Sequence, residues 1–365
     1  MTGPVRLLAA AAALLVTGGI VVAAGSAAAH EDSGSDSGSD SGAASSQSDS
    51  GDSGDSGDSG DDDSGDDEQF AGRDQASPPD DDDYVDITQV SPGADGKGGQ
   101  FSPAGTFRTD CGRNADGAHR NSDNFVLAPG KRNGAQHVHD YVGTTATFDS
   151  SDDQLQSADT TCGNGDRSTY YWPVIRDLNG TGDDEDDDGG GKDGNEGSIT
   201  APSSVDLTFH GNPKEDVVAA PQALRLATGD AKAGTEGDQN ANAKWTCTGF
   251  EDRTTTKYPE CPQGSRLVRI LDFPSCWDGE NTDSDDHRSH VAFPEEDGSC
   301  GEGTQPIPAL RMTLTYDRPD GTDFAVDSFP DQQHDPKTDH ASSINFMPKS
   351  LMKRAVRCIN DGIAC

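Results

Sequence analysis

The chain has 365 residues, and its 66 Asp and Glu against 27 Lys and Arg give a formal net charge of −39. This acidic balance excludes nucleic acid as a partner, because binding phosphate needs clustered cations. Hydrophobic residues make up only 30% of the chain, which is too polar for one uniform globule and predicts that part of the chain does not fold.

The first segment predicts an export signal over residues 1–29. Arg6 precedes an uncharged apolar run from Leu7 to Ala24, and the small residues Ala27 to Ala29 follow it, as in sites that signal peptidase cuts. An uncleaved membrane anchor is the alternative, since the run is about as long as a bilayer span. The rest of the chain has no second long apolar stretch. We therefore expect a secreted, extracellular protein that has no membrane contact after cleavage.

Residues 30–86 form a low-complexity tract rich in Ser, Asp and Gly. Positions 31–86 carry 20 acidic residues and one basic residue, so their charge is 1 − 20 = −19. Such a tract cannot bury enough apolar surface to offset the entropy of ordering, and we expect a disordered, self-repelling spacer. Weak condensation of calcium on the carboxylates is the alternative, although calcium sites need fixed oxygen cages.

The remaining residues, 87–365, should form one secreted β-rich domain, because they hold all eight cysteines and all three tryptophans. An acidic block at 183–197 interrupts this part with eight acidic residues and one Lys. Its alternating Asp residues resemble a calcium loop, but the twelfth position is Asn195 where such loops carry Glu. We interpret the block as a surface insertion.

Short apolar runs predict that this domain is mainly β. They are rich in β-branched or aromatic residues, and Gly, Pro, Asn or Asp bounds them. The runs are 169–175, 205–209, 243–247, 266–271 and 310–316. A stripe at helical spacing after Pro348 predicts one C-terminal helix. The stripe consists of Leu351, Met352, Ala355, Val356 and Ile359. We expect a β-sandwich or jelly-roll-like single domain with long loops.

Eight cysteines in an exported chain predict disulfides. Pairing neighbours along the sequence gives Cys111–Cys162, Cys247–Cys261, Cys276–Cys300 and Cys358–Cys365. Many other connectivities are open, since order along the chain does not determine pairing. A zinc site is a poor alternative, because no two cysteines have the close spacing that structural zinc sites favour.

Two pairs of histidines are the main candidates for chemistry. His137 and His139 lie two apart in a stretch expected to be extended, so both rings can address one point. His287 and His290 lie three apart in an acidic segment, where carboxylates such as Asp278 could orient the rings. The ordinary alternative is that these are solvated surface rings. The pattern predicts one pocket with these five residues in catalytic roles, or a divalent transition metal held by His137, His139 and His290.

Aromatic residues beside polar groups suggest carbohydrate as a ligand. Trp172 follows Tyr171 near the expected end of a strand, and Trp277 precedes Asp278. Aromatic rings stack on the apolar faces of sugars, while neighbouring polar groups bind hydroxyls. Burial of both tryptophans in the core is the alternative. The pattern adds Tyr171 to the catalytic candidates and makes both tryptophans candidates for substrate binding.

Several motifs together resemble a secreted family, the domain of unknown function numbered nineteen-ninety-six, which is frequent in fungi and present in actinobacteria. The motifs are His137-Val-His139, Tyr171-Trp172, Phe273-Pro-Ser-Cys-Trp-Asp-Gly279 and His287-Arg-Ser-His-Val-Ala-Phe-Pro294. The resemblance runs from about Phe107 to the C-terminal helix. It implies an extracellular domain, in some relatives joined to carbohydrate-binding modules, and it supplies no established reaction.

Near the C-terminus the chain departs from the family pattern. His340 and Asn345 fit the pattern and become candidates for substrate binding, but Ser342 replaces the family's Asp. Residues 346–347, Phe-Met, replace Gly-Trp. If that Asp takes part in chemistry, this member has lost or altered it.

Three hypotheses follow for the function. The first is an enzyme, a hydrolase or lyase, that acts on extracellular or cell-wall polysaccharide through a cleft of His, Tyr, Trp and Asp. The second is a non-catalytic module in which the same residues only bind glycan. The third is a structural domain in which a histidine cluster holds a transition metal.

Overall fold

The computed structural model describes residues 76–93, 101–102, 105–146, 150–180, 194–317 and 322–365. All of them belong to the unit Asp61–Cys365. The expected signal segment, the acidic tract before Ala76 and residues 183–193 of the insertion lie outside the described residues.

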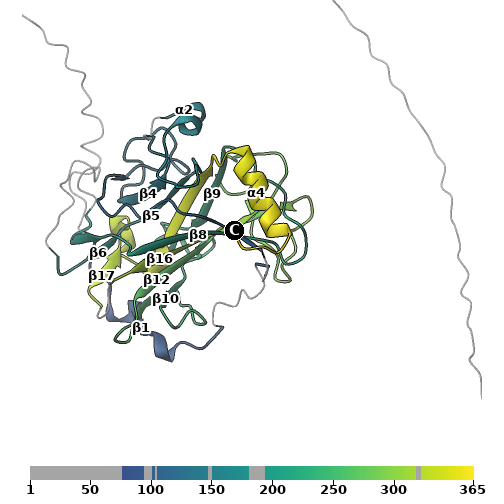
Figure 1. Cartoon of the computed structure of the whole chain (residues 1–365). Helices are drawn as coiled ribbons and strands as arrows, with labels where there is room; N and C mark the ends of the chain where they lie inside the picture. The colour runs from purple at the N-terminus through teal and green to yellow at the C-terminus, as the bar shows by residue number, and fades with distance from the viewer. Residues whose placement is uncertain (1–75, 94–100, 103–104, 147–149, 181–193, 318–321) are drawn as a thin grey trace, which may run out of the picture. The chain divides into compact units, whose positions relative to one another are not determined.

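Alternating apolar residues build a first antiparallel sheet of five strands (Figure 1). Its order is β10 (Trp245–Cys247), β12 (Leu267–Asp272), β16 (Ala309–Tyr316), β8 (Ser204–His210) and β2 (Thr106–Thr109). Leu310 pairs with Phe209 and Met312 with Leu207, and all four side chains are buried. Because side chains two apart share a face, this register gives the sheet one continuous apolar face.

A second antiparallel sheet of five strands supplies the other half of the core. Its order is β3 (Arg120–Asn121), β4 (His139–Gly143), β5 (Thr169–Pro173), β18 (His340–Asn345) and β9 (Leu224–Gly229). Val142, Tyr170 and Leu226 point into the core shared with the first sheet. On these strands Tyr141 and Tyr171 belong to a separate apolar cluster, so the second sheet buries both of its faces.

Smaller elements surround the two sheets. The remaining strands are β1 (Tyr84–Asp86), β6 (Ile175–Asp177), β7 (Ser198–Thr200), β11 (Tyr258–Glu260), β13 (Cys276–Trp277), β14 (Val291–Ala292), β15 (Gln305–Pro306) and β17 (Phe324–Val326). The short helices are α2 (Asp152–Ser157) and α3 (Ala233–Glu236). Single 3-10 turns occupy Asp81–Asp83, Ile87–Gln89, Pro330–Gln332 and Pro336–Thr338. The polar sequences of α2 and α3 carry no amphipathic stripe long enough to predict them.

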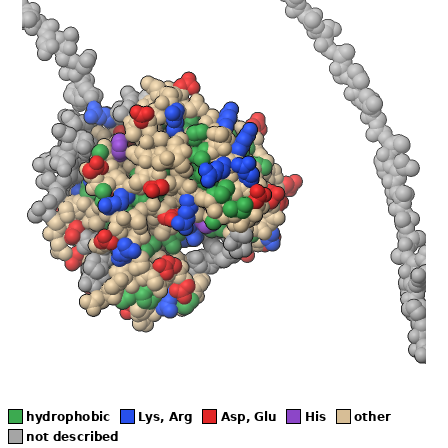
Figure 2. Space-filling model, viewed as in Figure 1, with side chains coloured by type: hydrophobic (Ala, Val, Ile, Leu, Met, Phe, Trp, Pro, Cys, Tyr) green, Lys and Arg blue, Asp and Glu red, His purple; other side chains and the backbone are tan. Residues whose placement is uncertain are grey.

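The predicted C-terminal helix is α4 (Lys349–Asn360), and it contacts β2 and β8. Met352, Ala355 and Ile359 are buried, as the helical spacing predicts. Its opposite face is basic, and Figure 2 shows these side chains gathered over the helix. After the helix Gly362 adopts a φ of +69°, a conformation that favours glycine, and the chain turns back beside β2.

Four disulfides pair the cysteines as sequence order predicted. They join Cys111–Cys162, Cys247–Cys261, Cys276–Cys300 and Cys358–Cys365. No cysteine of the described residues is free. Cys358–Cys365 ties α4 to the last residues, which hydrogen-bond with Thr106 of β2. Together with the strands and α4, these bonds confirm the expected mainly β fold with one C-terminal helix and disulfides.

Two boundaries differ from those expected. Folded structure begins before residue 87, since β1 pairs in parallel with β11 and the Tyr84 hydroxyl donates to Phe324 O. The acidic composition hid this strand, because its apolar content is only Tyr84 and Val85. At the end of the acidic insertion, Asn195 is buried and exchanges two hydrogen bonds with the backbone of Ser328. Asn195, which stands where a calcium loop would carry Glu, therefore attaches the end of the insertion to the rest of the domain.

Candidate functional site

Three buried histidines from distant parts of the chain meet at one point. The Nε2 atoms of His137 and His139 lie 3.2 Å and 3.3 Å from His340 Nε2. One ligand atom of each ring lies within 4.8 Å of the others. Three donors about 2.0 Å from a tetrahedral metal are separated by roughly 3.3 Å. These two separations therefore match the edges of a metal coordination tetrahedron.

Backbone carbonyls determine which ring nitrogens can act as ligands. His139 Nδ1 lies 3.0 Å from Asp123 O, and His340 Nδ1 lies 2.8 Å from Thr338 O. A carbonyl only accepts, so each Nδ1 must carry the proton and each Nε2 of the neutral ring must present a lone pair. The His139–His340 contact thus brings two lone pairs together. A hydrogen bond cannot explain this contact between neutral rings, whereas a shared cation explains it.

The contact between His137 and His340 can also be explained by a hydrogen bond instead of a shared cation. The backbone of Ala135 faces this ring as an acceptor and raises its pKa slightly against the effect of burial, but His137 Nδ1 has no partner within normal hydrogen-bond geometry. If the proton of His137 lies on Nε2, this atom can donate to His340. That arrangement accounts for one of the two contacts and leaves the other without a donor.

The strand order of the second sheet determines where the rings of His139 and His340 lie. His139 is the first residue of β4 and His340 the first of β18, and β5 lies between these strands. His139 pairs with Pro173 of β5. The two imidazoles therefore reach toward each other across the end of β5, where the strand terminates in a proline.

A buried ion pair places the third ring. The amide of Val138 donates to Asp327 Oδ2 (3.1 Å), and Asp327 in turn accepts from Arg176 Nε (2.6 Å). Val138 O also accepts from the amide of Val174. These bonds fix the backbone between His137 and His139, so both rings face His340.

The surroundings keep the three rings neutral. Burial lowers the pKa of His137 and of His139 well below the usual value, with the neighbouring imidazoles adding to the effect. Burial also lowers the pKa of His340. Phe329 packs edge-on to His137 and Tyr171 edge-on to His139, with ring centroids 5.0 Å and 5.2 Å apart. Metal binding requires histidine rings in the neutral form, because a protonated nitrogen has no lone pair for the ion. The three buried rings meet this requirement.

The motif His287–His290 does not place its rings in this cluster. His290 Nε2 donates to Arg225 O (2.7 Å), and its Nδ1 lies 2.9 Å from Ser284 Oγ. His287 has a φ of +56°, and its Nδ1 lies 2.9 Å from Asp283 Oδ1. Both nitrogens of His290 are therefore occupied by protein groups. The third histidine beside His137 and His139 is His340 rather than the expected His290.

Tyr171 lies beside the cluster but has protein partners of its own. It is fully buried, its hydroxyl donates to Asn124 Oδ1 (2.7 Å) and accepts from Val126 N (3.0 Å). Burial raises its pKa. Ser342, which departs from the family pattern expected from the sequence, pairs with Tyr171 across β5 and β18. An Asp at this position would share the face of β18 that carries His340.

The other predicted ligand-binding residues lie elsewhere. Trp172 is fully buried in the core between the sheets. Trp277 is half-buried in β13, and its Nε1 donates to Asn281 O. Asp278 is half-buried and accepts from the amides of Glu280 and Asn281, so it caps a turn. The structure therefore separates Trp172, Trp277 and Asp278 from the histidine cluster.

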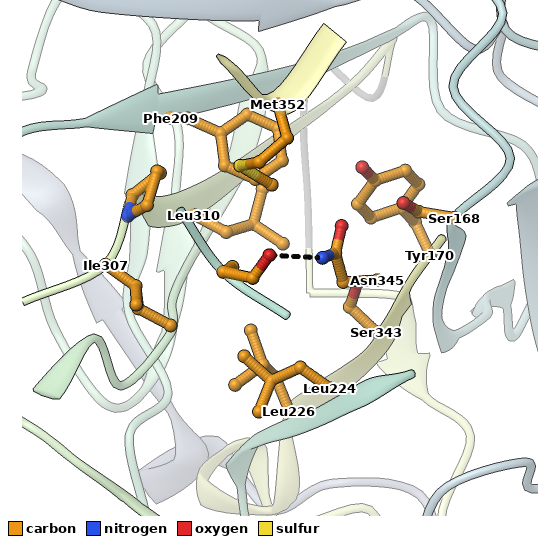
Figure 3. A pocket seen from close by; sticks show the side chains of 12 residues that line it. Ser168, Tyr170, Phe209, Leu224, Leu226, Ile307, Leu310, Ser343, Asn345 and Met352 are labelled. Carbon is orange, nitrogen blue, oxygen red and sulfur yellow. Dashed lines mark hydrogen bonds between the residues drawn. The ribbon is translucent and has the colours of Figure 1, made fainter. Parts of the chain in front are cut away.

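Asn345 lines a small internal cavity between the sheets and α4 (Figure 3). Its amide donates to Pro221 O (2.7 Å) and more weakly to Ala220 O (3.4 Å). The cavity is mostly apolar and its volume of about 20 Å³ has room for about one water molecule. Such a space is too small for a sugar, and it lies in the core rather than at the histidine cluster.

The fold and the cluster define a mainly β protein, built around two five-stranded sheets, with a buried set of three histidine nitrogens. The family model described as "Domain of unknown function (DUF1996)" matches residues 125–343, which is more than half of the chain. The chain belongs to this family, and all three histidines lie within the matched residues. No curated protein matches the chain, and no solved structure matches it.

Among the described residues, no helix combines the length and apolar character needed to cross a membrane. The four disulfides are consistent with an oxidising compartment, where such bonds form and persist.

Proposed function

We propose that the domain is an extracellular metal-binding protein whose centre is His137, His139 and His340. The supporting observation is the contact between His139 Nε2 and His340 Nε2. The two nitrogen atoms lie 3.3 Å apart, and both present lone pairs because backbone carbonyls hold the protons on Nδ1. The two lone pairs repel each other when no ion lies between them. A divalent transition metal such as zinc or copper would accept both lone pairs, so that coordination replaces the repulsion. Secretion, which the signal segment and the disulfides support, is part of the same proposal.

The donor set favours a centre that takes a further ligand. Three neutral imidazoles leave the fourth position of a tetrahedral metal open, as in catalytic zinc sites, whereas closed structural sites supply four protein ligands. The carbonyls of Asp123 and Thr338 act on the outer nitrogens, where such partners orient metal ligands and increase their basicity. When bound, the metal would supply Lewis acidity or redox chemistry at this open position.

The metal content of the purified chain tests the proposal. Protein made without a histidine tag should contain about one transition metal per chain, and stripping with a chelator should lower its melting temperature because the ion binds only the folded state. Adding back zinc or copper should restore the melting temperature. A chain that is folded, binds neither ion and shows no melting shift would refute the metal centre.

A role on extracellular or cell-wall glycan is a second proposal, carried by Trp277. This half-buried indole lies in a loop-rich region, with the half-buried Asp278 and the exposed Glu280 nearby, a combination that suits sugar stacking. We expect binding on a glycan array that Trp277→Ala reduces at least about tenfold. Binding that is absent in the wild type, or unchanged in the variant, would eliminate this role.

A further inference from the structure

Four exposed cations lie along the solvent-facing side of α4. They are Lys349, Lys353, Arg354 and Arg357, and we call them the basic face of α4. The chain has 66 acidic residues against 27 basic ones, and several exposed cations elsewhere in the domain have carboxylate partners, as in the pairs Lys232–Glu236 and Arg266–Asp317. Within the part of the chain that the structure describes, none of the four cations of α4 forms an ion pair.

The placement of these cations disfavours the helix itself. Lys349 is the first helical residue, and the first turn contains no acidic residue, although the positive end of the helix dipole favours carboxylates there. Lys353 lies four residues after Lys349 and four before Arg357, so two like-charge pairs are neighbours along one row. Helix formation therefore does not explain this pattern, whereas a bound anion would compensate the charges.

The basic face of α4 forms a narrow row. Because a helix rises about 1.5 Å per residue, Lys349, Lys353 and Arg357 are spaced roughly 6 Å apart along its axis and span about 12 Å. The apolar side of the helix is buried, and α4 contacts β2 and β8. The charged side is therefore the one that remains available to a partner, as Figure 2 shows.

The surroundings of this row decide which kind of anion fits. Helices that lie on membranes insert their apolar face into the lipid. That face of α4 is buried, and the large hydrophobic side chains exposed among the described residues are only Val218 and Ile363. A bilayer or a nucleic acid duplex is also wide enough to meet the acidic remainder of the surface. A thin single chain can follow the row alone, since charges more than about 8 Å away are largely screened at physiological ionic strength.

We propose that the basic face of α4 binds a linear polysaccharide that carries acid groups. Carboxylate or sulfate groups that recur along such a chain can pair with successive cations of the row, and the two arginines can each donate two hydrogen bonds to one group. Single ion pairs at an exposed site are weak, so the affinity comes from several acid groups of one polymer. This inference goes beyond the metal centre and depends neither on it nor on Trp277.

Binding of polygalacturonate, a carboxylate polymer, to the full chain tests the proposal, with neutral dextran as the polymer control. We expect saturable binding in dilute buffer that weakens as salt is added, and no binding of dextran. The double variant Lys353→Gln with Arg357→Gln should bind polygalacturonate about tenfold more weakly. Its melting temperature should not fall, because the change also removes both like-charge pairs.

The matched control is Lys232→Gln with Arg266→Gln, which removes two exposed cations outside α4 and changes the net charge equally. It should bind the polymer as the wild type does. Heparin in place of polygalacturonate distinguishes sulfate from carboxylate, and the tighter of the two polymers identifies the acid group. Equal losses in both double variants would show that net charge alone matters, and the proposal would then be wrong. Binding of anionic vesicles but of neither polymer, self-association in place of polymer binding, or no binding at all would also contradict it.

Discussion

Replacing His340 by alanine should weaken metal binding by about 100-fold or more, while replacing His290 should leave the affinity within a few-fold of the wild type. His340 Nε2 contacts both other rings of the cluster, so its loss removes one of three ligands and leaves only two. Changes in the partners that merely orient a ligand already cost about 10–100-fold in such sites. Competition with a chromophoric chelator measures both affinities directly.

The comparison with His290 is informative because the sequence alone favours that residue. His290 Nε2 is hydrogen-bonded to Arg225 O, so it has no free nitrogen for an ion in this conformation. His287→Ala is a second control, since the Nδ1 of this half-buried ring lies 2.9 Å from Asp283 Oδ1, outside the cluster. Equal losses for His340→Ala and His290→Ala would mean that the three-histidine cluster is not the binding site.

Most of the fold follows from local patterns in the sequence. The predicted runs coincide with β5, β8, β10, β12 and β16, because each alternates or concentrates apolar residues over strand length. One run, 169–175, extends past its strand, since Pro173 ends β5 and Ile175 is already the first residue of β6 in another sheet. The pairing of neighbouring cysteines was correct. Three of the four bonds join cysteines 7, 14 and 24 residues apart, while Cys111 and Cys162 are 51 apart.

The candidate site could be predicted only in part. The spacing of His137 and His139 predicts that they act together, and their ring centroids are 4.7 Å apart. Nothing local relates them to His340, which lies about 200 residues later and reaches them only through the sheet order β4–β5–β18. The carbonyls of Asp123 and Thr338, which hold the protons of His139 and His340 on Nδ1, are backbone groups. Every residue type has such a carbonyl, so the sequence cannot indicate which ones do this.

The sequence also predicted that His287 and His290 would join the cluster, but neither ring does. His287 and His290 bind other groups of the protein, and Arg288 between them donates to Gly229 O. Two histidines three apart resemble a ligand pair, but the φ of +56° at His287 turns the chain out of helical geometry. Spacing therefore gave no information about ring direction here.

The second large effect should come from the ion pair that joins the two sheets next to the cluster. Arg269 of β12 and Asp339 are both fully buried and hydrogen-bonded through two contacts. The guanidinium also donates to Pro173 O and to the Tyr316 hydroxyl, each at 2.9 Å. Asp339 directly precedes His340, so the pair anchors the start of β18 against the first sheet.

Asp339→Asn should lower the free energy of unfolding by about 3–5 kcal/mol, because it leaves the Arg269 guanidinium buried without a counter-charge. Chemical denaturation with the disulfides intact measures this loss. Asp206→Asn is the control, since Asp206 pairs with Arg108 at the surface, where the side chains are 39% and 66% exposed, and such pairs contribute at most about 1 kcal/mol. Combining Asp339→Leu with Arg269→Met should cost less than the sum of the two single changes, because no charge is then left unpaired. A loss for Asp339→Asn no larger than that of the surface control would show that the buried pair does not hold the sheets together, and the rigid placement of His340 would then need another cause.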